Sequence, residues 1–344
     1  EDQDRTDYIL ELNNKGSRFI GRYFGLAGIK HRFDSGTEAS LAYQRAIPEW
    51  GEAENGKSLH RFNAGIDHPF TFGLYGLDLS YVAYDQDPVI NTQQAGSCIL
   101  LLLGCTSNTV VATQVDLEST IYQAAVRGEQ VLRSTPAERW RLTERLEYKE
   151  VETNQDNVSE PVLDEAYGVL SIGAHYTQYP AHRHPDRYFA ATLEASAGFG
   201  SGGTLDSFER FEAAYLDANP TASRAPDIVP AARTAEFFAI KPKATFQQRI
   251  ANRSALSLTA AGQWSDEQVP QQEQYVLGGL NAMSAWLPGV LIGDSGYHLK
   301  ADIGMRFNWL GLSWQPSVFV EYGASWFTNT STDYGDEKSL ADTG

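Results

Sequence analysis

The two histidines at positions 182 and 184 come closest to a reactive cluster in this sequence. His182 and His184 are of a type that binds transition metals, and they flank Arg183. Pro185 follows directly, the segment is expected to be a short turn, and no cysteine or carboxylate cluster completes a ligand set. We therefore expect a polar turn here and no metal site.

Nucleophilic catalysis has no local motif in the chain. The Gly-x-Ser-x-Gly elbow of hydrolases is absent, and the Gly-rich stretch from Gly198 to Gly203 lacks the strand, loop and helix context of a phosphate-binding loop. A Ser, His and Asp triad assembled only in space would leave no trace in the sequence, so an enzyme stays open as an alternative. We expect no catalytic residue and no cofactor.

Cys98 and Cys105 are the only cysteines, and they lie in a segment rich in Gly, Ser and Thr. In an oxidising compartment they could close a small loop disulfide. Their spacing is equally compatible with two unpaired small residues. The sequence leaves these alternatives open.

Apolar side chains recur at every second position of several segments. In residues 298–307, Leu299, Ala301, Ile303, Met305 and Phe307 alternate with a second face formed by His298, Lys300, Asp302 and Arg306. A strand with one apolar and one charged face suits a barrel that encloses water. We predict a mostly solvated pore lining made of Lys241, Lys243, His298, Lys300, Asp302 and Arg306.

Composition excludes two classes of protein. The net charge of −17 argues against nucleic-acid binding, which needs a basic surface to neutralise phosphates. The longest apolar run, Ile99 to Leu103, is far below the roughly 20 residues of a transmembrane helix. Aromatic residues make up 12% of the chain, and Tyr and Trp favour membrane interfaces.

Period-two alternation predicts 13 strands of about 10 to 16 residues in an all-β, antiparallel transmembrane barrel. They are expected at 7–14, 18–33, 38–47, 58–70, 73–88, 118–134, 138–152, 162–178, 187–199, 234–249, 253–266, 296–307 and 312–327. A soluble β-sandwich is the alternative, but its strands are usually about 5 or 6 residues long, whereas a membrane strand needs about 9 to 11. Trp140, Trp264, Trp314 and Trp326 lie near strand ends, as in an interfacial girdle.

The predicted connections alternate between short turns and long loops. Short turns fall near 34–37, 71–72, 135–137, 180–186, 250–252 and 308–311, and longer loops fill 48–57, 89–117, 153–161, 200–233, 267–295 and the segment from 328 onward. The first connection, around Lys15 to Ser17, is an exception, because it is short on the long-loop side. Outer-membrane barrels have short periplasmic turns and long extracellular loops. The pattern therefore assigns the long loops to the cell exterior.

One loop carries a resemblance to a known superfamily. After Tyr275 the chain reads Val-Leu-Gly-Gly-Leu-Asn-Ala-Met-Ser-Ala-Trp, and later Gly-Asp-Ser-Gly-Tyr leads into a strand. This resembles the sixth extracellular loop of the Omp85 superfamily, in which Gly-Gly precedes a Val-Arg-Gly-Tyr tetrad and Gly-Asp-x-Gly opens the twelfth strand. The matching positions are Gly278, Gly279, Met283, Ser284, Ala285, Trp286, Gly293, Asp294 and Gly296.

Two further segments support the resemblance. Phe319, Glu321 and Gly323 on the thirteenth predicted strand are similar to the family's Phe-x-Asp-x-Gly segment. The first hairpin, Leu12 to Tyr23, resembles that of the two-partner-secretion (TpsB) branch, the hemolysin activation/secretion type. In the family, the tetrad arginine pairs with the carboxylate of strand thirteen, but Ser284 stands at the arginine position here. The resemblance thus predicts a divergent member with another partner for Glu321.

The resemblance implies a function, a location and a set of partners. We expect a monomeric outer-membrane protein of a Gram-negative bacterium, in contact with lipid and lipopolysaccharide, that secretes a partner exoprotein through a barrel gated by its sixth loop. We expect residues 1–344 to be one pore domain that lacks the last three of sixteen strands, the signal peptide and the POTRA modules. A porin-like diffusion channel, or a barrel-assembly or patatin-fused Omp85 protein, is the alternative.

Overall fold

Alternating side chains build one large antiparallel sheet in the computed structural model. The structure describes residues 5–13, 23–47, 58–86, 89–94, 109–114, 116–180, 186–200, 204–220, 222, 233–278, 283, 291–328 and 338–343. The large sheet has 14 strands, each paired with the next one in chain order. All-β architecture is thereby confirmed.

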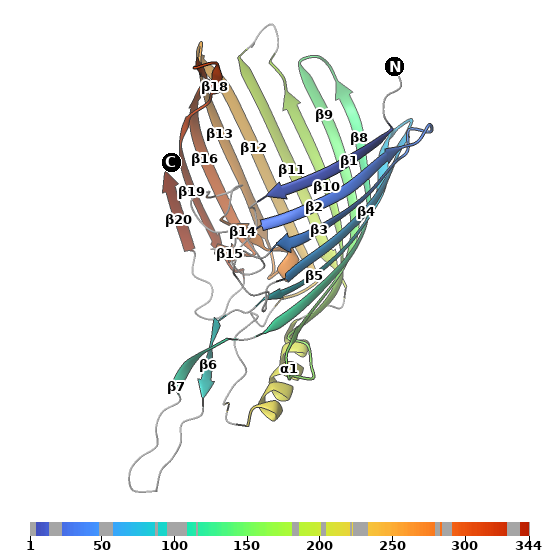
Figure 1. The fold of residues 1–344 in the computed structure, drawn as a ribbon, viewed down its shortest axis with the longest axis vertical. Helices are drawn as coiled ribbons and strands as arrows, with labels where there is room; N and C mark the ends of the chain where they lie inside the picture. Colours follow the sequence, from blue (N-terminus) through green and yellow to red (C-terminus); the bar gives the residue numbers. More distant parts are fainter. Residues whose placement is uncertain are drawn as a thin grey trace.

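The large sheet contains the following strands, in order. They are β1 (Thr6–Asn13), β2 (Tyr23–Arg32), β3 (Glu38–Ile47), β4 (Ser58–Phe70), β5 (Gly73–Gln86), β8 (Leu117–Ser134), β9 (Glu138–Gln155), β10 (Leu163–Gln178), β11 (Arg187–Phe199), β12 (Phe237–Ala251), β13 (Ser254–Ser265), β16 (Ser295–Met305), β19 (Ser317–Trp326) and β20 (Lys338–Thr343). The sheet curls around one axis, with β1 and β20 at its two edges (Figure 1). Among the described residues, each of these two strands pairs on one side only.

The 13 predicted strands all occur in this sheet, with changes at some ends. The segment expected at 18–33 is described as a strand only from Tyr23. The strand expected at 296–307 ends earlier, at Met305, and the strand expected at 312–327 begins later, at Ser317. Between them, β17 (Phe307–Trp309) and β18 (Leu312–Trp314) form a separate small hairpin. Strand β20 was not predicted, because its six residues show little alternation.

The two ends of the sheet differ as the connection lengths predict. Short turns join β2 to β3, β4 to β5 and β8 to β9 at one end (Figure 1). The opposite end carries the hairpin of β6 (Val89–Gln94) and β7 (Thr109–Gln114) and the helix α1 (Thr204–Ala218). Helix α1 was expected to be loop, and it packs Phe211 and Tyr215 against Leu117 and Val162 at the sheet rim. No helix among the described residues is long and apolar enough to cross a membrane.

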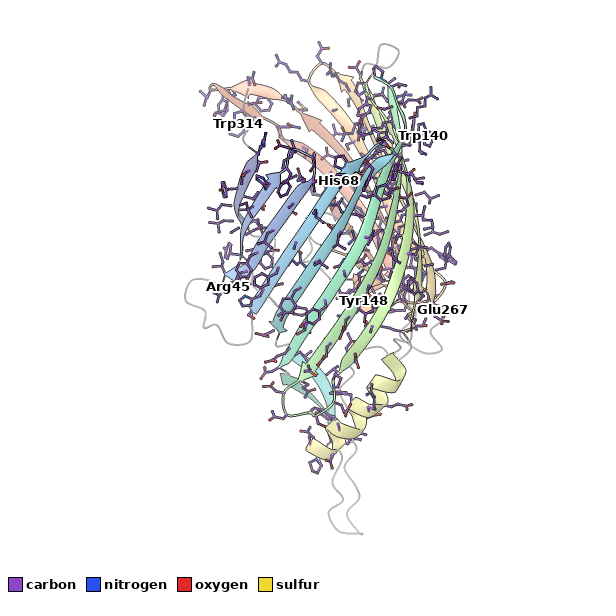
Figure 2. All side chains as sticks on the ribbon, turned by 90° about the vertical axis from the view of Figure 1, so that its right-hand side faces the viewer. Arg45, His68, Trp140, Tyr148, Glu267 and Trp314 are labelled. Atoms are coloured by element: carbon purple, nitrogen blue, oxygen red, sulfur yellow. The ribbon has the colours of Figure 1, made fainter. Side chains whose placement is uncertain are left out.

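The outer face of the sheet is apolar and banded by aromatic rings. Leu77, Leu79, Leu146, Leu193 and Ile303 are all more than 40% exposed on this face. Near the loop end, the rings of Tyr81 and Tyr122 lie 5.0 Å apart, and near the turn end those of Trp140 and Tyr176 lie 4.5 Å apart. Figure 2 shows Trp140 and Tyr148 at different heights of this wall. Two aromatic bands around an apolar surface are the girdles of a membrane barrel.

Candidate functional site: the inner wall and loop 6

The inner wall carries a chain of alternating charges that begins on β4 and β8. Arg127 places Nη2 2.7 Å from Asp67 and Nε 2.9 Å from Asp78. Arg145 on β9 continues the chain, with Nη1 3.2 Å from the same Asp78 and Nε 2.9 Å from Glu147. These residues occupy the positions opposite the exposed apolar ones, so strand alternation places them on one face and the register of the strands brings them together. The result is a polar, charged lumen surface.

Some of the predicted pore-lining residues lie in a hollow of this inner wall. Asp302 and Arg306 line a cavity of about 500 Å³ together with residues of β12 and β13. Lys243 on β12 is exposed, as expected of a solvated lining. His298, by contrast, is only 3% exposed, and the amines of Lys241 and Lys300 are in ion pairs. The lining is therefore less solvated than the sequence suggests.

Loop 6, defined here as residues 266–294 between β13 and β16, contacts this wall through Glu273. Glu273 ends the short 3-10 helix η1 (Gln271–Glu273), and its carboxylate lies 2.5 Å from Lys149 Nζ and 3.4 Å from Lys241 Nζ. The side-chain amide of Gln263 donates to its backbone carbonyl at 2.7 Å. Burial favours a higher pKa for Glu273, but the charges of Lys149 and Lys241 prevail and lower its pKa. The carboxylate is thus ionised and bonded at neutral pH.

The hairpin of loop 6 packs closely against β19. It consists of β14 (Tyr275–Leu277) and β15 (Leu291–Gly293). A methyl group on Gly293 would lie 2.5 Å from the carbonyl oxygen of Trp326, and one on Gly323 would lie 3.2 Å from Leu277. A side chain at Gly293 would collide with the Trp326 backbone, and one at Gly323 would be tight against Leu277, so both glycines have a packing role. Burial raises the pKa of Tyr275 to about 12.

Asp294 of the Gly-Asp-Ser-Gly segment fastens the base of loop 6. It is fully buried, and its carboxylate accepts hydrogen bonds from the backbone N–H of Val269 (3.1 Å) and of Thr328 (3.0 Å). The next residue, Ser295, accepts a bond from the Ser265 N–H at 3.0 Å. Burial raises the pKa of Asp294 despite the backbone donors. One motif therefore ties together both ends of loop 6 and the segment after β19.

A second buried pair lies next to the start of loop 6. Arg233 and Glu165 are 7% and 1% exposed, and their Nη1 and Oε1 atoms are 3.8 Å apart. Glu165 also accepts a bond from the Gln271 N–H at 3.4 Å. Val269 completes an apolar cluster with Tyr167 and neighbours on β10 and β12. The first half of loop 6 is therefore held by apolar and polar contacts together.

Glu321, the carboxylate of the Phe-x-Asp-x-Gly-like segment, has a partner on the adjacent strand. Lys300 Nζ lies 2.7 Å from its Oε1 and 4.3 Å from the centre of the Phe319 ring. His298 Nε2 is 3.9 Å from the same oxygen. Glu321 is 1% exposed, so the lysine neutralises a buried charge. Lys300, a strand residue, thus pairs with the carboxylate that in the family pairs with the loop arginine.

Several predicted residues cannot be placed. Gly279, Ser284, Ala285, Trp286, Cys98, Cys105, His182 and His184 lie outside the described residues. Of the remaining loop motif, Met283 is fully buried with φ of 63°, and Gly278 has φ of 106°. Within the part of the chain that the structure describes, no group of His, Cys, Asp and Glu could hold a metal ion.

One nucleotide-binding pattern is contradicted by its backbone context. Residues 51–58 read Gly-Glu-Ala-Glu-Asn-Gly-Lys-Ser, the spacing of a phosphate-binding loop. Such a loop leads into a helix whose N-terminus binds phosphate. Here Ser58 begins strand β4 instead. The pattern therefore does not indicate a nucleotide site.

Sequence reasoning missed Glu273 and Lys149. Lys149 lies on the inner face of a predicted strand, so alternation could have selected it. Glu273 lies in a loop without periodicity, and its contact with Lys149 spans 124 residues of chain. No local signal points to that contact.

Comparisons with known proteins agree with this geometry. The family model "Haemolysin secretion/activation protein ShlB/FhaC/HecB" matches residues 111–341. CdiB from Escherichia coli is similar with a TM-score of 0.69 and 13% identity, over 99% of this chain and 55% of that one. CdiB from Acinetobacter baumannii gives 0.63 and 15%, over 99% and 53%. The chain thus spans about half the length of these structures, and at such identities the likeness shows the fold. The search of curated proteins found no match.

Proposed function

The chain belongs to the haemolysin secretion/activation family ShlB/FhaC/HecB, and from this we propose that it forms the pore of an outer-membrane translocator for two-partner secretion (type Vb). A partner exoprotein would cross the outer membrane of a Gram-negative bacterium through the barrel in an unfolded state. Loop 6 would close the barrel until the passenger arrives. The activity belongs to the whole protein, of which this chain supplies the pore.

The docked loop is the observation that carries this proposal. Glu273 of loop 6 contacts Lys149 and Lys241, and Leu277 packs on Gly323 of β19, so the loop lies against the inner wall. A translocator that stays closed between passengers requires a loop that is held against its inner wall by several contacts. A diffusion pore can also carry such a loop, so the family match is what favours the translocator over the porin.

The charged inner wall suits an unfolded passenger. An extended chain exposes backbone and side chains of every type, and a wall of paired charges stays hydrated and offers no large apolar patch on which the chain would bind. ATP is absent from the periplasm, so folding of the passenger outside the cell would supply the driving force. No catalytic residue, nucleic acid or cofactor enters this proposal, and the partners are the passenger, lipid and lipopolysaccharide around a monomer.

Single-channel conductance of the full-length protein in planar bilayers tests the proposal. The wild type is compared with a variant that lacks residues 282–289 of loop 6. We expect the deletion to convert a small, flickering conductance into a large, steady one. A wild type that is already wide and steady, and unchanged by the deletion, would favour the porin-like channel instead.

A further inference from the structure

The loop anchor that the resemblance implies cannot form in this chain. Position 284 is serine, which carries no charge. The carboxylate of Glu321 is taken by Lys300 at 2.7 Å, from the neighbouring strand. Loop 6 nevertheless lies against the inner wall, with Leu277 and Met283 fully buried. Contacts other than an arginine–carboxylate pair therefore hold the loop there.

Glu273 has the position and the partners for this task. Its side chain is 6% exposed and lies between two lysines of different strands, Lys149 on β9 and Lys241 on β12. Strands β10 and β11 separate these two strands in the sheet. One carboxylate of the loop therefore joins two distant parts of the barrel wall. Charge-assisted bonds of this kind are the strongest polar contacts in a confined site.

The two lysines also have wall partners of their own. Lys149 Nζ lies 3.3 Å from Glu147, and Lys241 Nζ lies 3.9 Å from Glu194. When the loop leaves, each lysine can turn fully to its wall carboxylate, so no buried cation is left unpaired. When the loop undocks, the carboxylate of Glu273 enters water, and its charge is then hydrated. The contact can thus be strong when closed and still reversible.

We propose that Glu273 is the positioning residue that holds loop 6 in the lumen, as a reversible electrostatic latch between Lys149 and Lys241. This proposal rests on the proposed function, because a latch matters only if the loop closes the pore. It moves the anchor from the loop tip, where the family has its arginine, to the first half of the loop. Opening then includes the release of one carboxylate from two strands.

Substitutions in the full-length protein test the latch through the open probability of single channels. Glu273→Gln keeps the size of the side chain and removes its charge, and we expect the open probability to rise about tenfold or more. Glu273→Asp keeps the charge and should stay mostly closed. The control is Glu236→Gln, an exposed carboxylate directly before β12, which should behave as the wild type.

A reversible cross-link separates the latch from a general loss of structure. Glu273→Cys and Lys241→Cys are combined with Cys98→Ser and Cys105→Ser and joined by a short, reducible thiol cross-linker. We expect a closed channel that opens when the cross-link is reduced. The proposal is overturned if the loop deletion opens the pore while Glu273→Gln stays closed, or if the cross-linked channel stays open. A deletion without effect overturns the proposed function itself.

Discussion

Gly293→Ala is the sharpest test of how loop 6 is packed. The added methyl group would lie 2.5 Å from the carbonyl oxygen, 2.8 Å from the nitrogen and 2.9 Å from the carbonyl carbon of Trp326. All three atoms belong to Trp326, the last residue of β19, which pairs with Ser295 of β16. Because this pairing holds Trp326 in the large sheet, β15 and the hairpin must move away from the wall.

The expected cost follows from this geometry. Ordinary contacts of a methyl group begin at 3.4 Å, so the hairpin must shift by roughly 1 Å. Overpacking of a well-filled site costs about 1 to 3 kcal/mol, and contacts with three fixed backbone atoms put Gly293→Ala in the upper part of that range. A cost of about 2 to 3 kcal/mol moves the equilibrium between docked and undocked loop by roughly 30- to 150-fold.

Hydrogen exchange in the full-length protein measures this equilibrium. We expect the backbone amides of the β14 and β15 ladder to exchange about 30- to 150-fold faster in the variant, while amides of β9 and β10 are unchanged. Gly304→Ala on β16 is the matched control, because its methyl group would meet no atom closer than 3.8 Å. Exchange in Gly293→Ala within about threefold of the wild type would refute the close packing of β15 on β19.

Three further variants or conditions test other parts of the site. Lys300→Met leaves the buried carboxylate of Glu321 without its lysine. Removal of one partner of a buried pair costs about 3 to 5 kcal/mol, and we expect about 2 to 3 kcal/mol for this partly exposed lysine. The midpoint temperature of the heat-induced shift in gel mobility should fall, and an unchanged midpoint would contradict this. Phe211→Ala leaves a cavity between α1 and the sheet rim and should destabilise the docked helix by about 3 kcal/mol. Limited proteolysis should then cleave the helix faster while the barrel stays intact. The pKa of Glu273 is lowered from its usual value of about 4.5, so the latch is complete above pH 4.5 and is lost as the pH falls through the lowered pKa. The open probability should therefore stay constant from about pH 5 to 8 and rise only below about pH 4.5. A rise near pH 6 would contradict the assignment.

Strand positions and faces follow from the sequence because their signal is local. Side chains of a strand alternate with period two, so the apolar positions of segments such as 298–307 predict which face of the strand contacts lipid. The structure confirms the exposure of Leu299 and Ile303 on that face. Helix α1 also has a local signal, with Phe211 and Tyr215 spaced by four residues between Thr204 and Pro220. It was missed because the segment was read as a connection between strands.

The partner of Glu321 illustrates what a sequence motif predicts and what it does not. The sequence identifies the carboxylate and, through Ser284, the loss of the loop arginine. It cannot name the replacement, because Lys300 becomes a neighbour of Glu321 only through the register of β16 against β19. That register depends on the whole set of pairings in the sheet.

The sequence alone therefore determines the all-β class, the inward and outward faces and the motif that marks loop 6. The tertiary structure decides what holds that loop. The contacts of Glu273 with Lys149 and Lys241 join positions 124 and 32 residues apart. Such contacts have no periodicity, and they exist only because the curled sheet brings the inner faces of β9 and β12 around one buried carboxylate.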